Sequence, residues 1–252
     1  MHAPYSPLNT PLDQIRSCKD AKAGKVTLDT PMAESPEISR EAISAMRRSY
    51  GEVGITESSI NPDPIAQFSL WLNEATENSM IIEANAMVLS TLGQDGPSSR
   101  TVLLKDVDQS GFTFFTNYQS DKSRQIQANP KVSLLFPWYP MERQVIVIGS
   151  ASKIDQAESE KYFASRPWSS QIGTLASSQS EVIDSRQVLE ERFKELAEKY
   201  PQGSVVPKPE NWGGYLVKPS VIEFWQGRYS RLHDRLRFNQ SGSNWSLERL
   251  SP

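Results

Sequence analysis

The sequence has few of the residues that hold metal-dependent or disulfide-stapled folds together. Its 252 residues include one cysteine, Cys18, and two histidines, His2 and His233. One cysteine cannot form an intramolecular disulfide or a cysteine-based metal site, and two histidines exclude a multi-histidine metal site. We therefore expect no metal. A chain without disulfides is typical of a reducing compartment, so we expect a cytoplasmic protein.

Long apolar runs and an excess of one charge are also missing. No window is long and apolar enough for a transmembrane helix, so we expect no membrane partner. The chain has 27 Lys and Arg against 30 Asp and Glu, which leaves no global basic field and no general case for nucleic acid. The length fits one large domain, or one domain with tails.

Several sequence motifs of nucleotide-binding proteins and hydrolases are absent as well. There is no Gly-x-Gly-x-x-Gly after a strand, no Gly-x-x-x-x-Gly-Lys-Ser/Thr loop, no Gly-x-Ser-x-Gly elbow and no His-Glu-x-x-His. A phosphate group would therefore have to be bound by cationic side chains on a different scaffold.

Most of the chain after residue 85 has the pattern of closely spaced β-strands. This pattern favours antiparallel pairing in a barrel or sandwich, so we expect a mainly β protein of the α+β class. Asp63 and Pro64 predict a helix start, as N-cap and first helical residue. Strands are predicted over 86–92, 98–105, 111–117, 131–138, 143–153, 215–217, 221–225, 232–238 and 245–250. Further helices are predicted over 38–50, 121–129, 155–166 and 184–200.

The N-terminal segment differs from the rest of the chain. Residues 1–40 contain five prolines, mixed charge and little apolar periodicity, which predicts a disordered leader. The segment lacks the apolar core of a secretory signal, and its acidic residues argue against a mitochondrial transit peptide. We expect one domain over residues 41–252.

The most informative stretch is 221–235, which predicts a strand, a turn at Gly227 and a second strand. Alternation along the second strand would place Arg231, His233 and Arg235 on one face. Two guanidiniums beside an imidazole suit an anionic, planar ligand. A basic strand face is usually only solvated, but here we favour a functional site.

Two other groups of residues could bind anions. Arg100 and Lys105 bracket an apolar strand, and their odd spacing places them on opposite faces unless a bend at the strand end redirects Lys105. Thr116 and Lys122 flank a turn and a predicted helix N-terminus, which Ser120 or Asp121 could cap. Each pattern is common and is weak evidence by itself.

Tyr162, Arg166 and Ser170 recur at four-residue spacing around a predicted helix end. A phenol, a guanidinium and a hydroxyl that converge would form a phosphate clamp. The alternative, that they are unrelated surface residues, is equally compatible with the spacing.

Together these segments resemble the pyridoxine/pyridoxamine 5′-phosphate oxidase family. The resemblance covers roughly residues 46–252 and is most specific in Glu223-Phe-Trp-Gln-Gly227 and Arg231-Leu-His-Asp-Arg235. It implies an FMN-binding split β-barrel with flanking helices, a C-terminal dimerisation region and a homodimer with FMN in clefts at the subunit interface. It also implies the last step of vitamin B6 salvage and pyridoxal phosphate synthesis. In that step pyridoxamine or pyridoxine 5′-phosphate is oxidised to pyridoxal 5′-phosphate, with O2 as acceptor and H2O2 as product.

The resemblance also implies roles for individual residues. Arg231 and His233 would be catalytic, lying over the substrate's pyridine ring and assisting proton removal. Residues 47–50, which spacing alone predicts to be a charged helix end, would form a mobile arm over the substrate. The FMN contacts would be Arg100, Thr101, Val102, Leu103, Leu104, Lys105, Phe115, Thr116, Lys122, Gln144, Gln179, Ser180, Trp225 and Arg235. The substrate contacts would be Arg47, Arg48, Ser49, Tyr50, Lys105, Tyr162, Arg166, Ser170, Arg231 and His233.

One position departs from the family pattern. The family usually has Ser-Arg-Lys where this chain has Ser120-Asp121-Lys122, so an acid replaces an FMN phosphate contact. Unless Asp121 caps the helix or Arg124 substitutes, FMN should bind more weakly than to an Asp121→Arg variant. Two other functions stay open: another split-barrel FMN enzyme, such as a flavin reductase, and a non-catalytic binder of pyridoxal phosphate or FMN.

Overall fold

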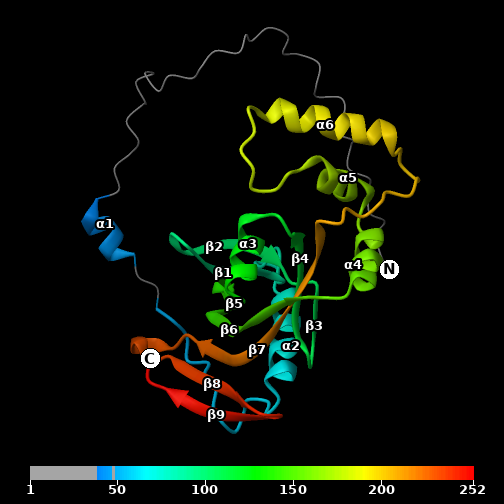
Figure 1. Ribbon diagram of the computed structural model, residues 1–252. Helices are drawn as coiled ribbons and strands as arrows, with labels where there is room; N and C mark the ends of the chain where they lie inside the picture. Colours follow the sequence, from blue (N-terminus) through cyan, green and yellow to red (C-terminus); the bar gives the residue numbers. More distant parts are fainter. Residues whose placement is uncertain (1–38, 47–48) are drawn as a thin grey trace, which may run out of the picture. The chain divides into compact units, whose positions relative to one another are not determined.

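The computed structural model describes residues 39–46 and 49–252, and Figure 1 shows the elements in chain order. The chain divides into two compact units, Met1–Arg47 and Arg48–Pro252. The described part of the first unit is helix α1 (Arg40–Ala45), whose N-cap Ser39 accepts the Ala42 N–H at its Oγ. The helix predicted over 38–50 is wrong at its C-terminal end, because Met46 already leaves the helical conformation. Nearly all of the predicted leader, with Arg47 and Arg48, lies outside the described residues.

The second unit is built on one antiparallel sheet, which contains nine strands among the described residues. The strand order is β2-β1-β5-β6-β7-β4-β3, with β8 paired to β7 and β9 to β8. This confirms the prediction of a mainly β, antiparallel fold. The strands are β1 (Ala86–Gly93), β2 (Gly96–Leu103), β3 (Asp106–Asp108), β4 (Gly111–Asn117), β5 (Lys131–Trp138), β6 (Arg143–Lys153), β7 (Trp212–Gln226), β8 (Asp234–Ser241) and β9 (Asn244–Leu250).

Strand β7 is the element on which the sheet divides. It pairs with β6 along its length, while its first half also pairs with β4 and its second half with β8. The prediction of two separate strands here is wrong, because a bulge carries β7 past Pro219, which has no N–H to donate. Gly149 faces this bulge, where a Cβ atom would lie 2.3 Å from the Lys218 carbonyl oxygen.

Helices flank the sheet, and α2 and α4 begin at aspartates that accept their free N–H groups. Asp63 is the N-cap of α2 as predicted, and its Oδ1 accepts the N–H groups of Ile65 and Ala66. Pro167 ends α4 as predicted, but a second helix that the sequence analysis missed begins directly after it. The helices are α2 (Pro64–Glu77), α3 (Asp121–Ala128), α4 (Gln156–Ser165), α5 (Trp168–Ala176) and α6 (Arg186–Lys199), with 3₁₀ turns at Tyr139–Met141 and Tyr229–Arg231. Within the described ranges, no helix has the length and apolar character needed to cross a membrane.

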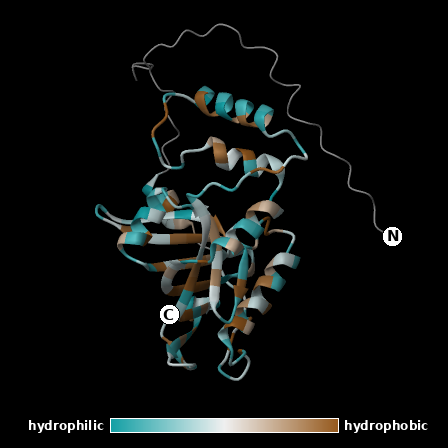
Figure 2. Cartoon of the chain, turned by 45° about the vertical axis from the view of Figure 1, so that its right-hand side comes forward, coloured by the Kyte–Doolittle hydropathy of each residue, from teal (hydrophilic) through white to brown (hydrophobic). Residues whose placement is uncertain are grey.

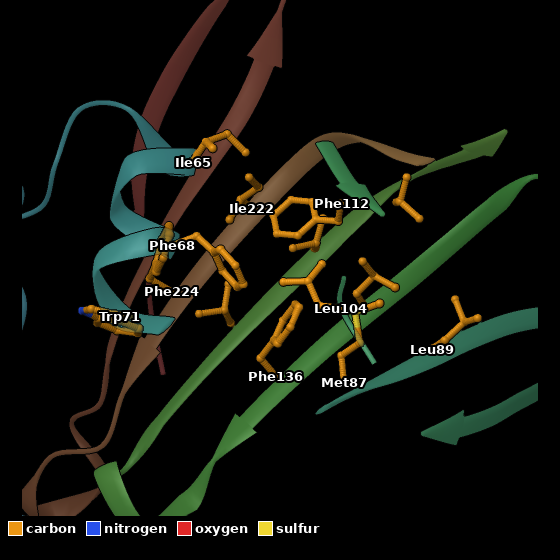
Figure 3. Packing of buried hydrophobic residues seen from close by; sticks show 14 of the residues in the cluster. Ile65, Phe68, Trp71, Met87, Leu89, Leu104, Phe112, Phe136, Ile222 and Phe224 are labelled. Carbon is orange, nitrogen blue, oxygen red and sulfur yellow. The ribbon is translucent and has the colours of Figure 1, made fainter. Parts of the chain in front are cut away.

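The main core lies between α2 and the sheet. Phe68 of α2 is fully buried and packs edge-on against Phe112 and Phe136, at centroid distances of 4.9 and 4.7 Å. Trp71, one turn further on, meets Phe224 of β7 at 5.2 Å (Figure 3). Hydrophobic and hydrophilic residues alternate along the strands (Figure 2), as expected for a sheet with one well-buried face. Through Phe112, this packing also fixes β4, one of the strands on which the candidate site is built.

Candidate functional site

A cavity of about 850 Å³ opens beside the ends of β2 and β4. This volume lies in the upper part of the usual range for ligand sites, roughly 300–1,000 Å³. The walls come from six helices and strands (β2, β4, α3, α4, α5 and β7) and from the segments that follow β2, α4 and α5. The lining residues that the sequence predicted as FMN or substrate contacts are Arg100, Thr101, Val102, Leu103, Lys105, Phe115, Thr116, Lys122, Tyr162, Arg166, Ser170, Gln179 and Ser180.

The cavity is strongly cationic. Its lining includes Arg100, Lys105, Lys122 and Arg166 against a single carboxylate, that of Asp121. Burial lowers the pKa of the Arg100 and Arg166 guanidiniums. Partly buried cations in this number favour a ligand with more than one negative charge.

Lys105 reaches the cavity through a bend. Strand β2 ends at Leu103, and the Lys105 N–H then donates to the Thr113 carbonyl at 2.8 Å. Leu104 is 4% exposed and does not line the cavity, whereas Lys105 lines it together with Arg100. Arg100 and Lys105 therefore line the same cavity, and β2 has ended before Lys105, as in the alternative of a bend at the strand end.

Lys122 lies at one end of the cavity, in the first turn of α3. Its Nζ donates to Thr116 Oγ1 at 3.2 Å, to Ser120 Oγ at 3.0 Å and to Gln179 Oε1 at 3.1 Å. Burial and, to a smaller extent, the charge of Arg100 lower the pKa of the Lys122 ammonium to about 8, while Asp121 opposes the shift. The structure thus brings Thr116, Lys122 and Gln179 together as predicted.

Asp121 begins α3 next to Lys122 but does not cap the helix. Its backbone N–H donates to Ser180 Oγ at 3.2 Å, and its exposed carboxylate pairs with Arg124. Ser120 occupies the N-cap position without capping, and its Oγ donates to the Asn117 carbonyl and accepts from Lys122 Nζ. Neither compensation considered from the sequence is present, since Arg124 is not among the cavity-lining residues.

The predicted clamp also lines the cavity. Arg166 Nη1 donates to Thr174 Oγ1 at 2.7 Å, and the Arg166 Cζ lies 4.9 Å from the centroid of the Trp212 ring. Tyr162 stacks on Phe115 at 3.9 Å. Tyr162, Arg166 and Ser170 line one cavity, so the alternative of unrelated surface residues is wrong. Thr174 was not predicted to belong to the site, although Thr174 continues the same four-residue spacing.

A second group of predicted residues forms a row across three strands. Gln144 of β6 is directly opposite Trp225 of β7, which is directly opposite Arg235 of β8. Directly opposite residues of antiparallel strands project from the same face of the sheet. The His233 ring lies 4.7 Å from the Trp225 ring, and Tyr50 meets both rings edge-on. We call Gln144, Trp225, His233 and Arg235 the C-terminal group.

The predicted strand alternation of Arg231, His233 and Arg235 is wrong. Residues 229–231 form a 3₁₀ turn, and β8 begins only at Asp234. Ser230 and Arg231 have φ values of 54° and 61°, in the left-handed region that non-glycine residues seldom adopt. Such strain is often found at functional sites.

His233 is oriented by the backbone rather than by strand geometry. The Arg228 N–H donates to His233 Nδ1 at 3.0 Å. An Nδ1 that accepts a hydrogen bond carries a lone pair, so the neutral ring has its proton on Nε2. His233 is therefore arranged to donate a hydrogen bond from Nε2.

An ion-pair network next to His233 was not foreseen. Asp234 accepts Arg249 Nη1 at 2.6 Å and the Ile55 N–H at 3.1 Å. Arg249 also binds both carboxylate oxygens of Glu57, which lowers the pKa of Glu57 to about 2. The network attaches the segment around Ile55, five residues after Tyr50, to the start of β8.

The cavity and the C-terminal group lie near opposite ends of β7. Trp212, the first residue of β7, lines the cavity, and Trp225 lies 13 residues further along the strand. A strand rises about 3.3 Å per residue, so the two ends are up to about 43 Å apart. Figure 1 shows β7 running from the region of α4 to β8 and β9. None of the C-terminal group lines the cavity.

Comparison with known families decides what this arrangement belongs to. Residues 74–200 match the family model of pyridoxamine 5′-phosphate oxidase, and residues 212–252 match that of the pyridoxine 5′-phosphate oxidase C-terminal dimerisation region. The chain belongs to the pyridoxine/pyridoxamine 5′-phosphate oxidase family. The boundary between the two matched regions lies close to the start of β7. Most of the cavity-lining residues therefore belong to the first matched region, and β8 and β9 belong to the second.

Relatives that carry the oxidase name are similar over nearly their whole length. The pyridoxine/pyridoxamine 5′-phosphate oxidase of a Nocardioides species is 51% identical over 211 residues, which cover 83% of this chain and 98% of the relative. That of Rubrobacter xylanophilus is 50% identical over 218 residues, covering 86% and 100%.

Solved structures support the same fold. PhzG from Burkholderia lata 383, in complex with tetrahydrophenazine-1-carboxylic acid, has a TM-score of 0.74 and 29% identity, covering 80% of this chain and 99% of PhzG. A pyridoxamine 5′-phosphate oxidase-related, FMN-binding protein from Nostoc punctiforme has a TM-score of 0.59 and 16% identity, covering 74% and 96%. The second likeness is evidence for the fold alone. The sheet of this chain has the strand arrangement of a split barrel that is not closed.

Proposed function

We propose that this chain is an FMN-dependent oxidase that converts pyridoxamine 5′-phosphate and pyridoxine 5′-phosphate to pyridoxal 5′-phosphate, with O2 as acceptor and H2O2 as product. The observation that carries the proposal is a four-cation cavity in a chain about half identical to relatives named for this activity. The proposal includes a predicted leader over 1–40, one catalytic domain over 41–252 and a cytoplasmic location, which the single cysteine favours.

The residues present fit FMN and a phosphorylated substrate in one cavity. Thr116, Lys122 and the first turn of α3 offer a hydroxyl, an ammonium and helix N–H groups for one phosphate. Tyr162, Arg166 and Ser170, with Lys105, offer a second cationic end for the other. When bound, FMN takes two electrons from the substrate and passes them to oxygen.

We assign the C-terminal group to the site of a second copy of the chain in a homodimer. Within one chain none of the group lines the cavity, and Trp225 lies 13 residues beyond Trp212 along β7. The family's dimerisation region covers residues 212–252, which include Trp225, Arg231, His233 and Arg235. Each complete site would then combine the cavity of one copy with the C-terminal group and Arg231 of the other.

The catalytic roles that we propose concern orientation and charge. The clamp residues hold the substrate phosphate, while Arg231 and His233 lie over the pyridine ring. Because His233 accepts the Arg228 N–H at Nδ1, its Nε2 donates a hydrogen bond to the substrate and does not take a proton in this tautomer. This changes the earlier expectation that His233 assists proton removal. Arg231 adds a positive charge that would stabilise negative charge developing on the substrate.

The arm at residues 47–50 belongs to the same proposal. Tyr50 contacts Trp225 and His233, which supports a position over the pyridine ring. Ser49 is exposed next to it. The arm would shield the bound substrate from water.

The test of this function is anaerobic. The chain is reconstituted with FMN, pyridoxamine 5′-phosphate is added, and the flavin's visible absorbance is followed. We expect bleaching, with colour restored by air. A flavin that stays oxidised until a nicotinamide donor is added would overturn the proposal in favour of a flavin reductase. A ligand-bound chain without turnover in either assay would indicate a non-catalytic binding protein.

Asp121→Arg is expected to tighten FMN binding. The substitution replaces the only carboxylate among the cavity-lining residues with a cation and ends the Asp121–Arg124 ion pair. An added charge-assisted contact of about 1.4 kcal/mol corresponds to a tenfold lower Kd. The measurement is an FMN titration of both apoproteins by fluorescence quenching. Equal affinities would contradict the prediction.

FMN affinity is expected to fall above about pH 8. The Lys122 ammonium, with a pKa of about 8, loses its charge as the pH rises through that value, so the phosphate loses a cationic partner. FMN affinity begins to fall at the pKa of Lys122 in the free chain and levels off at the higher pKa of Lys122 in the FMN complex. Between these values the affinity falls by at most about tenfold per pH unit. FMN titrations from pH 6.5 to 9.5 measure it. The Lys122→Met chain is the control, and a parallel fall in this variant would contradict the assignment to Lys122.

A further inference from the structure

Gln125 of α3 connects the helix to the strands behind the cavity wall. Its Oε1 accepts hydrogen bonds from Thr91 Oγ1 at 2.5 Å, Ser98 Oγ at 3.0 Å and Arg100 Nη2 at 3.3 Å. We call Thr91, Ser98, Arg100 and Gln125 the Arg100 cluster. One amide oxygen thus collects three donors from the β1–β2 hairpin, and one of these donors is a guanidinium that lines the cavity.

Within the Arg100 cluster the guanidinium fork points into the protein. Arg100 Nη1 donates to the Leu89 carbonyl at 3.2 Å and to Thr91 Oγ1 at 2.5 Å, while Nη2 donates to Ser98 Oγ at 2.5 Å and to Gln125. Four of the five N–H donors of the guanidinium are thereby used. Arg100 therefore offers the cavity a fixed positive charge and its Nε–H, rather than a fork that can rotate towards a ligand.

Strand register explains why these side chains meet. Leu89 is directly opposite Arg100, and Thr91 is directly opposite Ser98. Residues two apart on a strand share a face, so all four project from the same side of the hairpin. Thr91 is only 3% exposed, and burial lowers the pKa of Arg100. A partly buried cation needs its hydrogen bonds to be satisfied, and the cluster provides them.

We propose that Gln125 is a positioning residue of the FMN site. It fixes the Arg100 guanidinium at the cavity wall and joins it to α3, the helix whose first turn carries Lys122. The two cations are then held at a constant separation from each other, so the cavity is preorganised for an anionic ligand. The inference rests on the proposed function, because it takes FMN as that ligand.

The experiment measures the Kd of FMN for full-length apoproteins by flavin fluorescence quenching. Gln125→Leu keeps the approximate side-chain size but removes the shared acceptor, and we expect the Kd to rise about tenfold. Gln125→Glu retains an acceptor oxygen, and we expect a smaller rise. An unchanged Kd for Gln125→Leu would overturn the inference. Should this variant not fold, Ser98→Ala removes another acceptor of Arg100 from the strand side, and an unchanged Kd there would overturn it equally.

Two comparisons separate positioning from general damage. In an Arg100→Gln background, Gln125→Leu should have no further effect on the Kd, since Gln125 acts through Arg100. Additive effects would overturn the inference. Gln127→Leu is the matched control, because Gln127 lies on the same helix, is exposed and donates to the Tyr118 carbonyl at 3.1 Å. Its Kd should stay at the unsubstituted value, and an equal rise in this variant would also overturn the inference. If the unsubstituted chain does not bind FMN, the proposed function fails, and the inference fails with it.

Discussion

Replacing His233 or Arg231 with alanine is expected to lower kcat by about 10²–10⁴-fold, while FMN binding changes little. The His233 ring is held by the Arg228 N–H and by contact with the Trp225 ring, so its Nε2–H has a fixed direction. A fixed donor stabilises the transition state without cost of reorganisation, and its removal therefore affects turnover more than binding. Steady-state oxidation of pyridoxamine 5′-phosphate and a separate FMN titration measure the two effects.

Leu232→Ala is the matched control for this pair. Leu232 lies between Arg231 and His233 and is 63% exposed, so its truncation alters the same turn without removing a polar group. We expect its turnover to stay close to that of the unsubstituted chain. Full turnover in both the Arg231 and His233 variants would refute the roles proposed for them. An equal loss in the Leu232 variant would show that the shape of the turn matters, rather than the two polar groups.

Arg166→Ala is expected to lower kcat/KM for pyridoxamine 5′-phosphate by about 10²–10³-fold, because a partly buried charge pair with the phosphate is lost. The Arg166 side chain is held by Thr174 and lies over the Trp212 ring, so the chain has already ordered it before the substrate arrives. Its contribution is therefore not offset by the entropy of fixing a long side chain.

The same variant distinguishes a phosphate contact from a wider defect. With pyridoxamine that lacks the phosphate, Arg166→Ala should react about as well as the unsubstituted chain. Neither chain can then form the contact between Arg166 and a substrate phosphate. Lys161→Met, on the exposed side of α4 next to Tyr162, removes a positive charge close by and should leave kcat/KM unchanged for both substrates. Loss of reaction with both substrates in the Arg166 variant would indicate a damaged cavity instead of a lost phosphate contact.

Local sequence signals were sufficient for those elements whose boundaries are set by short-range chemistry. Asp63 and Pro64 start α2 where the capping pattern predicts, and the strand predicted over 143–153 has the same bounds as β6. The strand predicted over 111–117 likewise has the same bounds as β4. In each case the preference of the residues and the demand of the fold agree.

The errors occur where tertiary contacts override local preference. Helix α5 begins directly after the helix-ending Pro167, because Trp168 packs against Phe193 of α6 and its Nε1 donates to the Tyr200 carbonyl. Strand β7 continues past Pro219 because β6 accommodates a bulge opposite Gly149. Neither feature can be read from a window of a few residues.

The site was predictable in membership but not in geometry. Resemblance to the oxidase family named the residues, and the structure collects most of the proposed FMN and phosphate contacts in one cavity. No pattern of residue types indicates the left-handed backbone at Arg231, and the inward fork of Arg100 depends in part on the contact of the β1–β2 hairpin with α3. Gln125 was missed for the same reason, because its partners are about 25–35 positions away in sequence.

The separation of the cavity and the C-terminal group along β7 has a consequence for dimers formed from two different variants. In the proposed dimer, each copy provides the cavity for one site and the C-terminal group for the other, and β7 contributes Trp212 to the first and Trp225 to the second. Consider a mixed pair in which one chain lacks the Arg166 cation and the other lacks the His233 imidazole. One of its two sites would contain both defects, whereas the other would contain neither. Two inactive chains could thus complement each other, so activity belongs to the pair of chains rather than to either chain alone.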